Sequence, residues 1–124
     1  MSFKGKVEKI PRRSIYFLGE KDGESEREIK NIWTKLLAKL DGVNEAYLPV
    51  ISLNESREAS PALCLYPYPK SEKEKKIVLH TLGEAFVKIF HGSQHLDMLF
   101  LSEEERKSCL KKCRPFYKKI PDFS

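Results

Sequence analysis

The sequence predicts an α+β fold in the form of a two-layer sandwich. Helical and strand-like patterns follow one another in the order β-α-β-β-α-β-α, which places helices on one face of a four-stranded, mostly antiparallel sheet. The simplest arrangement of this order is a variant of the ferredoxin-like split β-α-β sandwich, with a third helix at its end. The 124 residues, 40% of them hydrophobic, suit one core. We expect a single domain over residues 14–119, a basic N-terminal extension (1–13) and a short tail (120–124).

Three helices are predicted by capping boxes, in which a serine oxygen accepts from a free N–H of the first turn and a glutamate three residues later bonds back to the cap. The pairs are Ser25 and Glu28, Ser71 and Glu74, and Ser102 and Glu105. Apolar residues recur at helical spacing over 29–40, and Gly42 is available for a left-handed cap after them. A second helical stripe covers 77–90, and a short third helix ends before Pro115.

Four strand-like runs separate these helices, at residues 14–18, 45–53, 61–66 and 96–101. Proline cannot donate a ladder hydrogen bond, so Pro49 predicts a bulge or an edge within the second run. The helical side of the core is expected to contain Trp33, Leu36, Leu37, Phe86, Ile89 and Phe90. The runs are apolar on both sides, so the sequence leaves open which alternate residues face these helices: Tyr47 or Leu48, Leu63 or Cys64, and Met98 or Phe100.

The charge of the chain is unevenly distributed. The formal net charge is +5, but residues 1–13 sum to +4 and residues 106–119 to +7, whereas residues 14–105 sum to −5. An acidic protein, a nucleic acid or an anionic membrane surface could each bind such basic segments. The alternative is that these residues form an ordinary solvated surface.

Composition excludes several classes of protein. No apolar run approaches the ~20 residues of a membrane span, and Ile15–Leu18 is too short for the apolar region of a signal peptide. Three cysteines are an odd number and do not make a disulfide framework. We therefore expect a soluble, cytoplasmic protein with reduced thiols.

Residue types that carry chemistry are few and scattered. Cys109 and Cys113 share one face of the third helix, so they could form a thiol pair or, with His91 and His95, a zinc site. Alternatively the two thiols pack in the core as small apolar groups, as we expect for Cys64.

Two further polar residues are candidates for catalysis. His80 lies among apolar residues of the second helix, and Asp97 lies within an apolar strand-like run. Both are interpreted as ordinary packed or solvated side chains. No phosphate-binding glycine loop, nucleophile elbow or paired-carboxylate motif is present. The sequence therefore predicts no catalytic residue, no metal site and no cofactor.

The same order of elements also occurs in RNA-binding sheets, which display aromatic side chains on their central strands. Residues 15–18 and 98–100 offer aromatic side chains, but the basic-Gly-aromatic-Gly signature of those sheets is absent. The acidic balance of residues 14–105 also opposes a surface that follows phosphates. Nucleic acid is therefore the weaker alternative as a partner.

Three motifs resemble a known family. The segments are Gly42-Val43-Asn44-Glu45-Ala46-Tyr47-Leu48, Leu96-Asp97-Met98-Leu99-Phe100-Leu101 and Arg114-Pro115-Phe116-Tyr117-Lys118-Lys119. They are similar to the "V-x-x-A-Y-L" strand, the "V-D-x-x-x-L" strand and the "P-F-Y-K-R" ending of the C-terminal domain of the SseB (enhanced serine sensitivity) family, and Leu82-Gly83-Glu84 matches its second helix. The resemblance covers about residues 14–119. It implies a bacterial, cytoplasmic α/β domain with regulatory or interaction roles, and it brings no catalytic residue or cofactor.

These observations favour a non-enzymatic regulatory or protein-interaction domain whose partner is an acidic protein surface. The expected partner-binding residues are Arg106, Lys107, Lys111, Lys112, Arg114, Phe116, Tyr117, Lys118 and Lys119. Phe116 and Tyr117 are interpreted either as side chains that fix the tail to the core or as an aromatic anchor for the partner. The alternatives are an enzyme or binder of a small amino-acid-like ligand near Asp97, His80 or His95, and a nucleic-acid-binding domain. The sequence predicts no oligomeric state.

Overall fold

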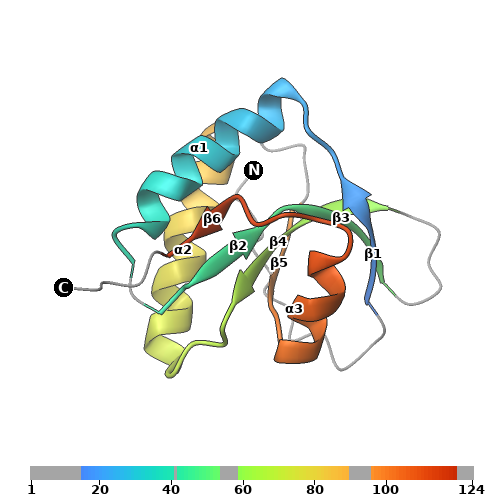
Figure 1. Ribbon diagram of the computed structural model, residues 1–124. Helices are drawn as coiled ribbons and strands as arrows, with labels where there is room; N and C mark the ends of the chain where they lie inside the picture. The colour runs from blue at the N-terminus through green and yellow to red at the C-terminus, as the bar shows by residue number, and fades with distance from the viewer. Residues whose placement is uncertain (1–14, 41, 54–58, 90–95, 120–124) are drawn as a thin grey trace.

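The computed structural model describes residues 15–40, 42–53, 59–89 and 96–119 (Figure 1). Several sequence expectations lie outside these residues: the basic extension, the tail and the residues 90–95, which include Phe90, His91, Gly92 and His95.

The described residues form an α+β structure with three helices and a mostly antiparallel sheet, as predicted. The elements in chain order are β1 (Ile15–Glu20), α1 (Glu24–Leu37), β2 (Glu45–Tyr47), β3 (Pro49–Leu53), β4 (Ser60–Tyr66), α2 (Glu72–Ile89), β5 (Asp97–Phe100), α3 (Glu103–Leu110) and β6 (Tyr117–Lys118). The expectation of four strands is wrong, because the sheet has six. Pro49 divides the predicted second strand into β2 and β3, and β6 is an additional strand after the last helix.

Strand pairing shows how the six strands share the width of the sheet. β2 and β3 both run antiparallel to β4, so they occupy one position beside it. On their other side, β1 pairs with β3 and β6 pairs with β2, both antiparallel. β5 runs parallel to β4 and lies on its far side.

The ferredoxin-like arrangement is not confirmed by this pairing. A split β-α-β unit would place another strand between the first strand and the next one along the chain. Instead β1 lies directly beside β3 and runs antiparallel to it. The parallel neighbours are β4 and β5, which α2 connects.

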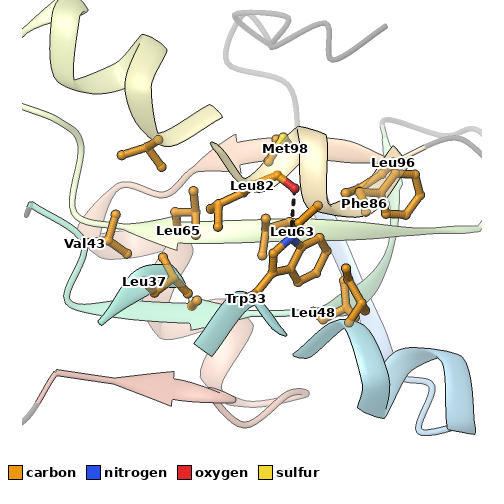
Figure 2. Close-up of a cluster of buried hydrophobic side chains, with 14 of the residues drawn as sticks. Trp33, Leu37, Val43, Leu48, Leu63, Leu65, Leu82, Phe86, Leu96 and Met98 are labelled. Carbon is orange, nitrogen blue, oxygen red and sulfur yellow. Dashed lines mark hydrogen bonds between the residues drawn. The ribbon is translucent and has the colours of Figure 1, made fainter. Parts of the chain in front are cut away.

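Helices α1 and α2 cover one face of the sheet (Figure 1). Trp33 lies at the centre of this layer, where its indole N–H donates to the carbonyl oxygen of Leu82 at 3.0 Å and its ring lies 6.4 Å from that of Phe86 (Figure 2). From the sheet, side chains of one parity meet these helices: Ala46, Leu48, Leu63, Leu65, Met98 and Phe100. Because the Trp33 side chain is fully buried, this hydrogen bond satisfies its one polar atom.

Helix α3 covers the opposite face, so the expectation of helices on one face only is wrong. Its buried Cys109, with Cys113 just beyond it, packs against strand residues of the other parity: Phe17, Tyr47, Ile51, Ala62, Cys64, Leu99 and Leu101. Burial on both faces explains why the strand-like runs are apolar on both sides. Leu48 and Leu63 therefore face α1 and α2, whereas Tyr47 and Cys64 face α3.

The capping prediction for α3 is confirmed. The Ser102 N–H donates to Glu105 Oε1 at 2.8 Å, and the Glu105 N–H donates to Ser102 Oγ at 3.2 Å. Ser71 also caps α2 as expected, because it accepts from the N–H of Glu74 at 3.1 Å. Both helices therefore begin where the sequence indicates.

The start of α1 differs from the prediction. The helix begins at Glu24, so Ser25 lies inside its first turn and is not the cap. Glu26 accepts from the N–H of Gly23 at 2.9 Å, two positions before the predicted pair. After α1, Gly42 has φ +92°, the left-handed conformation that the sequence indicated.

Candidate functional site

Helix α3, the segment after it, and strand β6 with the residue that follows carry a group of exposed cations, which we call the basic surface. It consists of Lys107, Lys111, Lys112, Arg114, Lys118 and Lys119. The buried Cys109 fixes the inner side of α3, so Lys107 and Lys111, about half a turn away from it, lie on the outer side. Among the described parts of the chain, no ion pair joins any of these six side chains to a carboxylate. Apart from Lys118, whose charge also acts on Glu45, their charges are therefore directed to solvent.

Arg106 belongs to the same basic segment but has an internal partner. Its Nε lies 2.6 Å from Glu45 Oε1 and its Nη2 lies 2.9 Å from Glu45 Oε2, which is a bidentate pair between α3 and β2. The Arg106 side chain is 23% exposed and that of Glu45 is 9% exposed. A charge-assisted pair of this geometry is strong and directional. Arg106, predicted as a partner-binding residue, is thus placed where it fixes α3 to the sheet.

Two tyrosines complete the surroundings of this ion pair. The Tyr47 hydroxyl donates to Glu45 Oε1, and the Tyr66 hydroxyl donates to Glu103 Oε2. The Arg106 guanidinium also lies 5.0 Å from the centre of the Tyr66 ring, within range of a cation–π interaction. Glu45, Arg106, Glu103 and the two tyrosine hydroxyls are therefore linked in one polar cluster.

These contacts determine the ionisation of Glu45. Hydrogen bonds from Arg106 lower the pKa of the Glu45 carboxyl, and the hydrogen bond from Tyr47 acts in the same direction. Burial beside that carboxylate raises the pKa of Tyr47. At neutral pH the cluster therefore contains a charged Glu45 and a neutral Tyr47.

Lys118, a cation of the basic surface on β6, lies beside this cluster. It lies opposite Glu45 in the register between β2 and β6, and its charge also lowers the pKa of Glu45. Neighbouring residues of a strand point to opposite faces, so Lys118 faces the α3 side of the sheet while Tyr117 faces the α1 side. Glu45 thus lies between a cation from α3 and a cation from β6.

Phe116 and Tyr117 pack inward. The Phe116 ring lies 6.0 Å from that of Trp33, and the Phe116 N–H donates to the carbonyl oxygen of Ala46 at 2.9 Å. The Tyr117 hydroxyl donates to the carbonyl oxygen of Leu37 at 3.4 Å. Both side chains are half-buried against the α1 layer. This placement favours the first of the two interpretations, in which they fix the end of the chain to the core.

Leu110 is a component that the sequence analysis missed. It directly follows the buried Cys109 in the chain, yet Leu110 is 41% exposed. Successive helical residues differ by about 100° around the axis, so a neighbour of the inward-facing Cys109 does not share its direction. Its position three residues after Lys107 was the available signal, because residues three apart are neighbours on a helix surface.

The three cysteines are free and buried in the layer beneath α3. Burial raises the pKa of the Cys64 thiol, and a hydrogen bond with Cys113 together with burial raises the pKa of Cys109, whereas the same hydrogen bond lowers the pKa of Cys113. Within the described ranges, no set of three or more His, Cys, Asp or Glu residues is placed to hold a metal ion. The arrangement suits packing better than thiol chemistry.

The other candidate polar residues lie apart from the basic surface. His80 is exposed on α2, where its Nε2 lies 3.1 Å from Glu84 Oε1. Asp97 is half-exposed at the first position of β5. His95 lies outside the described residues.

A comparison with protein-family models matches residues 21–119 to the SseB protein C-terminal domain. The chain belongs to this family. The resemblance predicted from the sequence motifs is thus confirmed. Searches of the curated proteins and of the solved structures found no match.

Two of the motifs lie side by side in this SseB C-terminal domain. The "V-x-x-A-Y-L" segment supplies β2, and the "P-F-Y-K" segment supplies β6, which pairs with it through Ala46 and Tyr117. The first motif also provides Tyr47, which bonds to Glu45, and the second ends at the exposed Lys118 and Lys119. Among the described helices, none is both long enough and apolar enough to cross a membrane.

Proposed function

We propose that this SseB C-terminal domain is a non-enzymatic regulatory or protein-interaction domain whose basic surface binds an acidic surface of a partner protein. The observation that carries the proposal is the concentration of six exposed cations on α3, the segment after it and β6, without carboxylate partners in the described chain. Complementary charge steers encounter and fixes the orientation of the two proteins. Such a cluster also repels itself and is stabilised when an acidic surface approaches it.

The framework beneath the basic surface supports the proposal. The capping box at Ser102 fixes the start of α3, and the Arg106–Glu45 pair fixes the helix to β2. Two backbone hydrogen bonds fix β6: the Phe116 N–H donates to the carbonyl oxygen of Ala46 at 2.9 Å, and the Lys119 N–H donates to that of Asn44 at 2.7 Å. The cations therefore project from ordered elements, which lowers the entropy lost on binding.

Burial on both faces of the sheet favours a protein over a nucleic acid as the partner. Sheets that bind RNA display aromatic side chains on their central strands. In β4, residues 62–65 are all buried, with Leu63 facing the α1 and α2 layer and Cys64 facing α3. Glu103 and Glu104 are also exposed at the start of α3, where they would repel phosphates close to the lysines.

Charge reversal tests the proposal. A triple variant, K111E/K112E/K118E, is compared with K73E/K76E/K88E, which makes the same change of charge at exposed lysines of α2. Each tagged protein is used for affinity capture from cells that express the chain, with nuclease treatment and quantitative mass spectrometry, after circular dichroism confirms folding. We expect wild type and the α2 variant to retain the same acidic protein and the first variant to lose it about tenfold or more.

Two results would reject the proposal. One is retention of the captured protein by K111E/K112E/K118E at the wild-type level. The other is loss of all captured material after nuclease treatment, which would indicate nucleic acid.

A further inference from the structure

The basic surface has an apolar centre. Leu110 is 41% exposed, whereas Cys109 beside it is fully buried. Lys107 precedes Leu110 by three residues, Lys111 follows it, and Arg114 comes four residues later. The hydrogen bond from the N–H of Cys113 to the carbonyl oxygen of Cys109, at 2.9 Å, continues the helical turn beyond Leu110. The exposed leucine thus has one cation a helical turn before it and further cations in the segment that follows the helix.

The chemistry of this surface changes along α3. Glu104, Lys107 and Lys111 follow one another at intervals of three and four residues, so they form one exposed ridge. The ridge is acidic at its first position and basic afterwards, with Leu110 beside its basic half. A partner that complements it needs carboxylates one helical turn apart and an apolar side chain between them.

We propose that the occupant of the basic surface is an acidic amphipathic helix of a partner protein, which lies along α3 and packs an apolar side chain on Leu110. This inference rests on the proposed function and names its partner element. The arrangement has an apolar centre and a charged rim, the usual anatomy of a protein interface. The exposed turns of α3 present side chains at the spacing that a second helix matches, which an extended chain does not.

The other polyanions match this surface less well. An exposed leucine adds little binding free energy against a nucleic acid, because proteins contact the sugar-phosphate backbone through polar and charged groups. An anionic lipid surface could take up the leucine, but Glu103 and Glu104 are exposed on the same helix and would be brought against negative headgroups. Both are kept as outcomes of the test.

The test uses a defined probe, a fluorescent helical peptide with glutamates at i and i+4 and a leucine between them at i+3. A control peptide has serine in place of that leucine. The proteins are wild type, L110S and I77S, since Ile77 is an equally exposed apolar residue, 47%, on α2. We expect L110S to weaken binding of the leucine peptide about tenfold, I77S to leave it unchanged, and the serine peptide to be insensitive to L110S.

Each remaining outcome has a defined meaning. Unchanged binding to L110S, or no binding of the leucine peptide to wild type, would overturn the inference. In either case the proposed function would still be decided by the capture experiment with K111E/K112E/K118E. Tighter binding of wild type to a DNA duplex or to vesicles with phosphatidylserine than to the peptide, at 150 mM salt, would overturn it in favour of those polyanions.

Discussion

The Arg106–Glu45 pair offers the sharpest test of how α3 is held, through the substitution Arg106→Met. Methionine keeps the aliphatic length of the side chain over Tyr66 but removes both hydrogen bonds to Glu45, at 2.6 and 2.9 Å. The Glu45 carboxylate, 9% exposed, would keep only the Tyr47 hydroxyl and the charge of Lys118 beside it. The change therefore leaves a nearly buried carboxylate without its main partner.

The expected magnitude follows from this burial. Breaking a buried ion pair by removing one partner costs about 3–5 kcal/mol. Arg106 is 23% exposed and Lys118 remains beside the carboxylate, so we expect a smaller loss, about 2–3 kcal/mol in the free energy of unfolding. With a slope of roughly 1–1.5 kcal/mol per M for a small domain, the urea midpoint should fall by about 2 M.

The assay is equilibrium unfolding in urea at pH 7, followed by tryptophan fluorescence and circular dichroism. Lys107→Met is the matched control, because Lys107 is exposed on the same helix, and it should change the free energy of unfolding by less than about 0.5 kcal/mol. The double variant R106M/E45M should recover part of the loss, since no unpaired carboxylate remains. A loss below about 1 kcal/mol for Arg106→Met would refute the reasoning.

Three further predictions concern the elements around the basic surface. Phe116→Ala should lower the free energy of unfolding by about 2 kcal/mol, because it removes a half-buried ring packed on Trp33, and a change under 0.5 kcal/mol in urea unfolding would contradict this. Ser102→Ala should cost about 1 kcal/mol in the same assay, whereas Ser25→Ala should be nearly neutral, because Ser102 caps its helix and Ser25 does not; equal losses would show that the cap is misplaced. The pKa of Glu45 is lower in the folded protein than its unfolded-state value of about 4.3, so the ionised carboxylate stabilises the fold above that pH, and this stability is lost as pH falls through the folded-state pKa. Wild type should therefore lose more free energy of unfolding than Glu45→Gln between pH 6 and pH 3. Parallel curves of stability against pH for the two proteins would disprove this.

Local signals predicted most of the secondary structure. Ser71 and Ser102 cap their helices where the capping pattern placed them, because that pattern depends on residues three apart in the chain. The prediction for Ser25 failed because Gly23 and Glu26 form a competing pair two positions earlier. Pro49 predicted an interruption and the structure has one, but the pattern could not show that both halves pair with β4.

The arrangement of layers needed information that the local patterns only partly contained. Strands that are apolar on both sides, such as β4, indicate burial on both faces. In the sequence, that observation served only to leave open which residues face inward, and helices were expected on one face; α3, which covers the other face, corrects that expectation. Strand order was harder to predict, because one order of elements is compatible with several pairings.

The candidate site, too, was only partly predictable from the sequence. The cations of the basic surface were visible as a run of charge in the sequence. The pairing of Arg106 with Glu45, which is distant in the chain, depends on the tertiary fold and was not predicted. The exposure of Leu110 could have been found by following the helical phase from Cys109 and the spacing from Lys107.

Photo-crosslinking in living cells tests the central claim most directly. A photoreactive amino acid is placed at Lys111 on the basic surface and, as a control, at Lys73 on α2; both positions are exposed. Mass spectrometry then identifies the crosslinked peptides. We predict crosslinks from position 111 to one protein, through a segment rich in Asp and Glu, and none to that segment from position 73. Crosslinks from position 111 only to nucleic acid, or the same proteins from both positions, would contradict the account.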